Sequence, residues 1–262
     1  MPLIQQLKTI TLYIQYFFTV VDEHSIQAPF AFQLYKELKK SKKEIMSNDE
    51  IEQYRRIFQN DHTQITSNDM GAGSIVSGAN TFSSVAKYGI SSEKDCLFLQ
   101  KLAEICKAKI CIELGTSLGI ATSYLAMANY MEKVYTFEGK KQLVKKSRQL
   151  FDDLRINKIQ IIQGNIDDKL PEILDNIGQI DLAIIDANHT ESALLAYFGL
   201  LKAKISPNGV IIIDDIRWSA EMHSGWLKLV KSAEVSLSID FLNKGVLFFG
   251  KGMQKQHYVL RY

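Results

Sequence analysis

From residue 91 onward, short apolar runs alternate with segments in which apolar side chains recur every three or four positions. The short runs predict buried strands and the longer segments predict amphipathic helices. A regular alternation of strands and helices is typical of a parallel, doubly wound α/β sheet. The five predicted parallel strands cover residues 110–114, 133–138, 159–163, 180–185 and 209–213.

Two further apolar stretches, residues 235–242 and 246–249, are separated by Asn243-Lys244-Gly245. This link is too short for a helical crossover, so the two strands must pair antiparallel as a hairpin. We therefore expect a mostly parallel seven-stranded sheet with an antiparallel last strand, in a domain that spans residues 91–262. A turn at Pro207-Asn208-Gly209 is expected just before the fifth strand.

Residues 1–90 have a different pattern, which predicts a helical N-terminal extension. Helices are expected near residues 3–21, 30–40 and 47–58, followed by a polar loop over residues 61–84. Within that loop, Asp69-Met70-Gly71-Ala72-Gly73-Ser74 has two interpretations that stay open, a lid over the active site and a plain surface turn. The first helix is apolar and is expected to pack on the domain or on a second copy, as in a homodimer.

The first strand of the parallel series runs directly into a glycine turn and then a helix. Gly115 and Gly119 suit positive φ angles or the close approach of a ligand, and Thr116 and Ser117 can cap the new helix. The spacing lacks the G-x-G-x-x-G pattern of dinucleotide sites, and no lysine follows Gly119 as a nucleoside triphosphate loop requires. The alternative interpretation of this segment is a strand, turn and helix that bind no ligand.

The string ELGTSLG, residues 113–119, resembles the first motif of the class I S-adenosylmethionine-dependent methyltransferases. The five predicted βα units and the final hairpin also resemble the Rossmann-like sheet of that family. The resemblance implies that S-adenosylmethionine is the cofactor and that this turn lies against its methionine part. The residues implicated are Glu113, Gly115, Thr116, Ser117 and Gly119.

The carboxyl ends of the second and third strands supply further candidates, because ligands of open α/β sheets bind beyond those ends. The second strand ends in Glu138, followed by Gly139, and a carboxylate there can accept hydrogen bonds from both ribose hydroxyls. The alternative to ribose binding is that Glu138 is an ordinary glutamate exposed to solvent. After the third strand, Asn165 could hydrogen-bond the adenine edge while Ile166 packs on its ring. The resembling family commonly has an acid where this chain has Asn165.

The fourth and fifth strands end in acids. Asp186 follows the fourth strand, and Asp214 and Asp215 follow the fifth. Three carboxylates suit a hard cation such as Mg²⁺ or Ca²⁺. Asp186 and His189 are also candidate general bases. The alternative is that Asp214 and Asp215 cap the next helix while Asp186 acts alone.

The patterns IIDANH and IIIDDIRW, which contain these acids, resemble the catechol and caffeoyl-CoA O-methyltransferases. In that group an Asp and an Asp-Asn pair bind a divalent metal, whereas this chain has Asp-Asp. The resemblance therefore implies a metal site formed by Asp186, Asp214 and Asp215. The whole chain also resembles an uncharacterised group of bacterial methyltransferases.

The composition limits the kinds of molecule that the protein is expected to bind. The formal net charge of +2 gives no electrostatic case for nucleic acid. No apolar run reaches the ~20 residues that span a bilayer, and the N-terminus lacks a signal-peptide pattern. The three cysteines have no metal-ligand spacing, which fits a cytoplasmic protein, and Cys111 is expected to be a buried apolar filler.

The function predicted from these patterns is methyl transfer from S-adenosylmethionine to a small-molecule hydroxyl, with or without a divalent cation. Two alternatives stay open: a metal-free or N-directed methyltransferase, and a non-catalytic protein that binds the cofactor as an interaction module. Acids at three strand ends argue against the second alternative.

Overall fold

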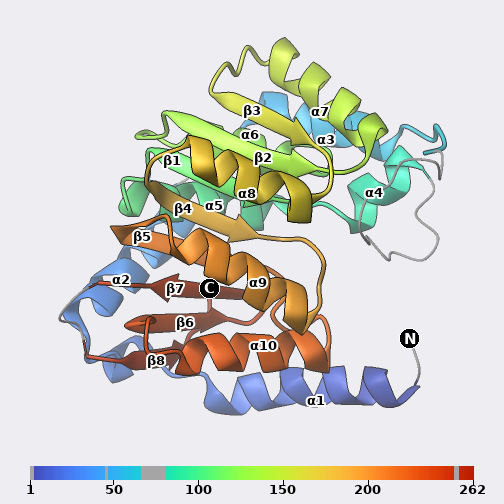
Figure 1. The fold of residues 1–262 in the computed structure, drawn as a ribbon. Helices are drawn as coiled ribbons and strands as arrows, with labels where there is room; N and C mark the ends of the chain where they lie inside the picture. The colour runs from blue at the N-terminus through green and yellow to red at the C-terminus, as the bar shows by residue number, and fades with distance from the viewer. Residues whose placement is uncertain (1–2, 45–46, 66–80, 251–253) are drawn as a thin grey trace. The chain divides into compact units, whose positions relative to one another are not determined.

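The computed structural model describes residues 3–44, 47–65, 81–250 and 254–262 (Figure 1). The fold is α/β, with a mixed and mostly parallel sheet of eight strands, which confirms the predicted fold class and adds one strand to it. By its internal contacts the chain divides into residues 41–178 and a second unit of residues 1–40 with 179–262. The loop at residues 69–74 lies outside the described residues, and the predicted domain boundary near residue 90 stays a prediction.

The unit of residues 41–178 contains three parallel strands in the order β3-β2-β1. Their register aligns the carboxyl ends of β1 and β2, with Leu114 opposite Phe137. The strands are β1 (Ile110–Leu114), β2 (Lys133–Glu138) and β3 (Ile159–Gln163). The helices are α3 (Asp49–Gln59), α4 (Phe82–Tyr88), α5 (Glu93–Ile105), α6 (Ile120–Ala126), α7 (Lys141–Asp153) and α8 (Ile166–Asn176).

The core of this unit holds α6 and the turn before it in place. Leu118 and Tyr124 are almost fully buried, in one cluster with Leu150 and Phe151 of α7. Fully burying such side chains stabilises a fold by about 1.5–3 kcal/mol each. The turn after β1 is therefore part of the packed interior, although it lies at the end of a strand. The expected burial of Cys111 in β1 is confirmed.

The unit of residues 1–40 and 179–262 contains five strands in the order β4-β5-β7-β6-β8. The pairs β4–β5 and β6–β8 are parallel, and β7 pairs antiparallel with both of its neighbours. The strands are β4 (Ile180–Ile185), β5 (Ile205–Ile213), β6 (Leu237–Phe241), β7 (Lys244–Phe248) and β8 (Gln256–Val259). The helices are α1 (Leu3–Thr19), η1 (Glu23–Ser25), most of α2 (Pro29–Glu44), α9 (Glu191–Lys202) and α10 (Ala220–Lys231).

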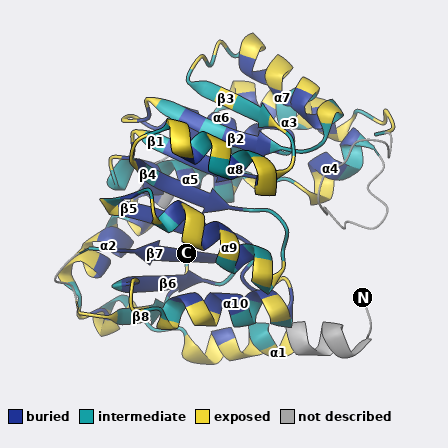
Figure 2. Ribbon diagram, viewed as in Figure 1, coloured by how far each residue is buried: buried dark blue, intermediate teal, exposed yellow. Residues whose placement is uncertain are grey.

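Strands β6 and β7 are buried along their whole length (Figure 2). Trp226 of α10 is fully buried against β7. A Cβ atom on Gly245 would lie 2.5 Å from the Trp226 ring, so only glycine permits this close approach. The hairpin predicted from the short 243–245 link is confirmed by the antiparallel register of β6 and β7, and its two-residue turn lies at Leu242 and Asn243.

The N-terminal segment is joined to the last residues of the chain. The Tyr16 hydroxyl donates to the Leu260 carbonyl at 2.7 Å, and the Val21 N–H donates to the Val259 carbonyl at 2.9 Å. Helix α1 also contacts α10 and runs along it (Figure 1). None of the described helices combines the length and apolar character that crossing a bilayer requires.

Three local predictions need correction. The expected turn at residues 207–209 lies inside β5, because β5 begins at Ile205 and its pairing shifts register between Ile180 and Leu182 of β4. Helix α4 begins at Phe82, within the stretch that was expected to be a loop. Thr116 and Ser117 do not cap α6, because its N-cap is Gly119 and no side chain bonds there.

Candidate functional site

The turn after β1 uses a left-handed backbone at three positions. The φ angles of Gly115, Ser117 and Gly119 are +109°, +51° and +78°. At Gly119 a Cβ atom would lie 2.7 Å from the Phe151 ring, so the turn can close only with glycine there. The predicted glycine turn is therefore present, and packing from α7 explains the second glycine.

Hydrogen bonds tie this turn to β2. The N–H groups of Gly115 and Thr116 both donate to the Phe137 carbonyl, at 3.1 and 2.9 Å. The hydroxyls of Thr116 and Thr136 lie 2.6 Å apart, and both side chains are buried. The Thr116 side chain thus faces the interior, which is why it cannot cap the helix.

Glu113 is fully buried beneath the turn. The hydroxyls of Thr122 and Thr136 donate to one of its carboxylate oxygens, at 2.5 and 2.6 Å. Burial raises the pKa of Glu113 to about 7, while the two hydroxyl bonds act in the opposite direction. Glu113 links α6 to β1 and β2, so it positions the turn from below, and its contact with a cofactor stays a prediction.

Glu138 lies beside the turn at the end of β2. Its two carboxylate oxygens accept from the Ser117 N–H at 2.9 Å and from the Lys140 N–H at 2.8 Å. Burial raises the pKa of Glu138, and these backbone donors oppose the rise. A carboxylate has about four acceptor sites, so the two oxygens can also accept from two hydroxyls. Gly139 follows at the strand end without a side chain.

Asn165 and Ile166 begin α8 after β3. The Asn165 side chain accepts from the Asp167 N–H at 3.1 Å and is the N-cap of this helix. Ile166 is buried. The sequence missed this capping role, although an Asn before two acids in the first turn is typical of an N-cap. The predicted adenine contacts of both residues stay predictions.

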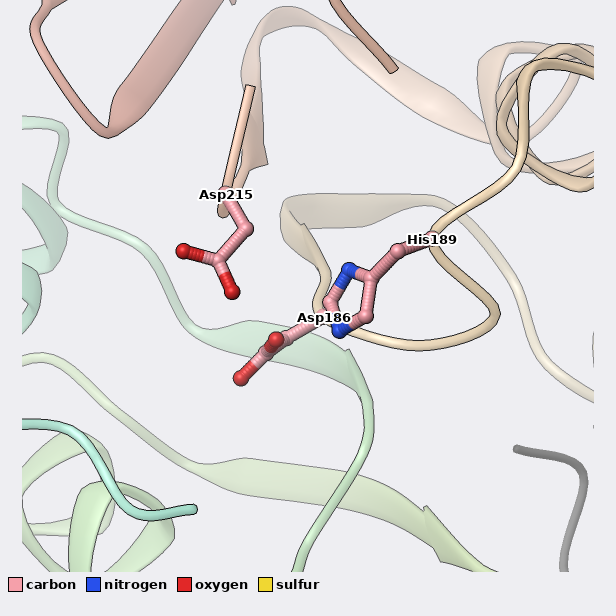
Figure 3. A group of neighbouring side chains, drawn as sticks. All are labelled: Asp186, His189 and Asp215. Carbon is pink, nitrogen blue, oxygen red and sulfur yellow. The ribbon is translucent and has the colours of Figure 1, made fainter. Parts of the chain in front are cut away.

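The acids after β4 and β5 lie at matching strand ends, because Ile185 pairs with Ile213. The Asp214 N–H donates to the Ile185 carbonyl at 3.0 Å and continues this pairing beyond the strands. The side chains of Asp186, His189 and Asp215 lie close together (Figure 3). Each offers one possible ligand atom, a carboxylate oxygen or a ring nitrogen, and these three atoms lie within 4.8 Å of one another. The structure thus brings together two of the three predicted metal ligands and adds a histidine.

Asp214 is held by a lysine. Both of its carboxylate oxygens accept from the Lys244 Nζ, at 2.9 and 2.8 Å, and the two side chains are nearly fully buried. One oxygen also accepts from the Asp215 N–H at 2.9 Å. The sequence did not predict this pair, since Lys244 was read as part of a hairpin turn 30 residues away.

His189 stands next to the carboxylates and packs against Trp218, with ring centroids 5.5 Å apart. Its Nδ1 atom is buried and has no hydrogen-bond partner within the part of the chain that the structure describes. Burial lowers the pKa of His189, which favours the neutral imidazole. The backbone of Asn188 is left-handed, at φ +50°, and its side chain donates to the Tyr197 hydroxyl. These contacts fix the loop that carries the imidazole.

Chemically, a neutral imidazole and two carboxylates can bind a divalent cation or accept a proton. A carboxylate such as Glu138 beside a glycine turn can accept hydroxyl donors. The hydroxyl-binding carboxylate belongs to the unit of residues 41–178, and the group that can bind a cation or a proton belongs to the unit of residues 1–40 and 179–262.

Part of the chain matches a known protein family. Residues 112–216 match a family model described as a methyltransferase domain. This match begins in β1 and ends just after Asp215, so it contains every predicted site residue. No curated protein matches the chain by sequence.

Several solved structures share the fold. The methyltransferase PaMTH1 of Podospora anserina, bound to SAH, is 17% identical, with a TM-score of 0.55 over 63% of this chain and 81% of that one. The O-methyltransferase TomG of Streptomyces achromogenes, bound to SAM, is 17% identical, with a TM-score of 0.54 over 62% and 82%. An O-methyltransferase of Bacillus cereus, bound to SAH, is 17% identical, with a TM-score of 0.54 over 78% and 91%.

At this level of identity the solved structures show the fold alone. The fold is that of the class I methyltransferases, as the ELGTSLG motif and the final hairpin predicted. The match of residues 112–216 to a methyltransferase-domain model confirms the prediction of a methyltransferase.

Proposed function

We propose that this protein transfers the methyl group of S-adenosylmethionine to a hydroxyl group of a small molecule, assisted by a divalent cation. The observation that carries the proposal is the carboxylate of Glu138, held at the glycine turn by the N–H groups of Ser117 and Lys140. The SAM and SAH complexes of the O-methyltransferases of similar fold support the same cofactor and the same acceptor atom.

The residues of the first unit have defined tasks in this proposal. Glu138 accepts hydrogen bonds from the ribose hydroxyls. The left-handed turn at Gly115, Ser117 and Gly119 contacts the amino-acid part of the cofactor. Asn165 and Ile166 contact the adenine. S-adenosylmethionine, when bound, supplies a methyl carbon on a sulfonium, so that a new oxygen–carbon bond replaces the sulfur–carbon bond and a proton is released.

The residues of the second unit act on the acceptor. Asp186 and Asp215, with His189, are the groups that fit a divalent cation, because two carboxylates and a buried imidazole nitrogen converge there. Such an ion, when bound, lowers the pKa of the acceptor hydroxyl. The metal-free alternative assigns proton removal to Asp186 or His189. Asp214, a predicted ligand, is instead proposed to act through its ion pair with Lys244.

The test is calorimetry with S-adenosylmethionine on the wild type and on Glu138→Ala. Loss of hydrogen bonds to a charged group weakens binding by about 1.5–3 kcal/mol, which is roughly 10- to 150-fold in affinity. The control is Glu132→Ala. Glu132 is exposed and forms a surface ion pair with Lys109, so this variant should bind the cofactor as the wild type does. A wild type that binds no S-adenosylmethionine would refute the proposed cofactor. Methyl transfer is then assayed with a panel of small hydroxyl compounds.

Two further parts of the sequence prediction stay proposals. A homodimer through the first helix is supported by four exposed apolar side chains on one face of α1, at Ile10, Ile14, Phe17 and Phe18. A cytoplasmic location and the lack of a nucleic-acid partner rest on the sequence arguments alone.

A further inference from the structure

The cluster after β4 and β5 has a donor set that the sequence did not predict. Three aspartates were expected to bind a hard cation through oxygen atoms alone. In the structure one of them, Asp214, is paired with Lys244, while His189 joins Asp186 and Asp215. We propose that this cluster binds a divalent ion of the Fe²⁺, Co²⁺, Ni²⁺ and Zn²⁺ class in preference to Mg²⁺ or Ca²⁺, with an imidazole nitrogen of His189 as one ligand. The inference rests on the proposed function, which gives that ion its task.

The first argument is that a buried ring nitrogen of His189 has no hydrogen-bond partner among the described residues. Buried polar atoms are almost always hydrogen-bonded, and one without a partner requires an explanation. The Nδ1 atom of His189 is buried without a partner among the described residues, and the two carboxylates lie on the side toward which its ring nitrogens point (Figure 3). Its ring is already oriented by Trp218, so a ligand atom there requires little reorganisation.

The second argument is the charge of the cluster. Lys244 bonds both oxygens of Asp214, so its positive charge offsets that carboxylate within the buried interior. The carboxylates of Asp186 and Asp215 then carry two formal negative charges next to the imidazole of His189. A divalent cation balances these two charges. A third carboxylate ligand would leave the cluster with an excess negative charge.

The third argument is the backbone that presents Asp215. Its φ angle is +55°, a left-handed conformation that is uncommon outside glycine, although Asp adopts it more readily than most residues. The Asp214 carboxylate accepts from the Asp215 N–H and thereby stabilises this conformation. The Lys244–Asp214 pair thus positions Asp215 without occupying a ligand position itself.

The class of ion follows from the ligand atoms. Mg²⁺ and Ca²⁺ take oxygen ligands almost exclusively, whereas imidazole nitrogen suits iron, nickel and zinc. Ions later in the first transition row bind most sites more tightly than Mg²⁺ does, so tighter binding alone proves nothing. The informative quantity is the part of the affinity that depends on His189.

The experiment titrates the full-length protein, stripped of metal, with CoCl₂ and separately with MgCl₂, using calorimetry and the visible absorption of Co²⁺. For the wild type we expect one Co²⁺ per chain and binding of Mg²⁺ that is weaker by at least about 100-fold. His189→Asn should lower the affinity for Co²⁺ by at least about tenfold, change the absorption bands and leave the weak binding of Mg²⁺ almost unchanged. Asp215→Asn should weaken the binding of both ions.

The matched control is His223→Asn. His223 of α10 also has a buried Nδ1 atom without a partner in the described structure, but it lies outside the cluster. Its substitution should leave the affinity for Co²⁺ and the absorption bands unchanged, and circular dichroism of each variant verifies folding.

Two results would overturn the inference: a Co²⁺ affinity that His189→Asn leaves intact, and an equal loss of Co²⁺ and Mg²⁺ binding. Calorimetry with S-adenosylmethionine and methyl transfer in excess chelator separate this failure from that of the proposed function. A protein that binds the cofactor and transfers methyl groups without any ion would refute only the metal. A protein that binds Co²⁺ through His189 but does not bind the cofactor would refute only the proposed function.

Discussion

The glycine turn after β1 and the acidic loop after β5 both hold carboxylates at strand ends, but with different partners. In the turn, Glu113 is held by two threonine hydroxyls and Glu138 by two backbone N–H groups. In the loop, Asp214 is held by the ammonium group of Lys244. Neutral donors add no positive charge beside a carboxylate, whereas a buried lysine does.

This difference separates the ligands that the two regions can take. Glu138 can offer a negatively charged acceptor to hydroxyl groups, which suits a sugar. The loop has one carboxylate already balanced. Its other acid, Asp215, lies with Asp186 and His189 from the segment after β4, and this group suits a cation. The loop also depends on charge for its stability, because removing either member of a buried ion pair leaves an uncompensated charge.

The largest expected effect is that of Lys244→Met. It leaves Asp214 buried without its cation, which should lower the free energy of unfolding by about 3–5 kcal/mol in a urea titration. The double variant Asp214→Asn with Lys244→Met should recover part of this loss, because no buried charge remains.

The matched control for this pair is Lys228→Met. Lys228 is more than half exposed in its ion pair with Glu191, and exposed pairs contribute about 0–1 kcal/mol. Equal losses of stability in Lys244→Met and Lys228→Met would contradict a special contribution of the buried pair.

A smaller effect is expected for Gly119→Ala in the glycine turn. The new methyl group would lie 2.7 Å from Phe151 in a left-handed backbone, and crowding and conformation together should cost about 2–4 kcal/mol. Gly199→Ala in α9 is the control, because nothing lies within 4 Å of its added Cβ atom. That substitution should stabilise the helix by about 0.5–1 kcal/mol, and a loss of stability in Gly199→Ala would contradict this prediction.

The smallest expected effect is a pH dependence at Glu113. Burial raises the pKa of its carboxyl group from 4.5 to about 7, so the folded state favours the protonated form. Its contribution to stability is therefore complete below about pH 4.5, decreases as the pH rises toward 7, and is lost above that. The total change is on the order of 3 kcal/mol, because each pKa unit corresponds to about 1.4 kcal/mol.

Glu113→Gln cannot ionise and so provides the reference for this effect. Urea unfolding of both proteins at pH 5, 6, 7 and 8 should show the wild type losing stability relative to the variant as the pH rises. Parallel curves would mean that the two threonine hydroxyls already stabilise the charged carboxylate fully.

Local signals in the sequence predicted the βα units, the glycine turn and the final hairpin. The turn was recognisable because an apolar strand ends directly at Gly115. Strand β8 was missed, since four residues of mixed polarity form a strand only when β6 lies beside them. Helix α10 was also missed, although Met222, Trp226 and Leu229 recur at helical spacing.

The residues of the candidate site were proposed from the sequence only where they lie at or just past the ends of predicted strands. Asp186 and Asp214 were proposed as site residues because each follows an apolar run directly, and Asp215 because it comes next after Asp214. The role of Lys244 depends on the hairpin bringing β7 alongside β5, and no local pattern encodes such a contact. The roles of these site residues stay predictions until they are tested in solution.

The bonds between the N-terminal segment and the last residues have a consequence for biosynthesis. Tyr16 binds the carbonyl of a residue 244 positions later, so this bond must wait while the ribosome translates the intervening chain. At about 5–20 residues per second the delay is on the order of 10–50 s. During that interval the nascent helix lacks its final partner and offers an apolar surface to chaperones.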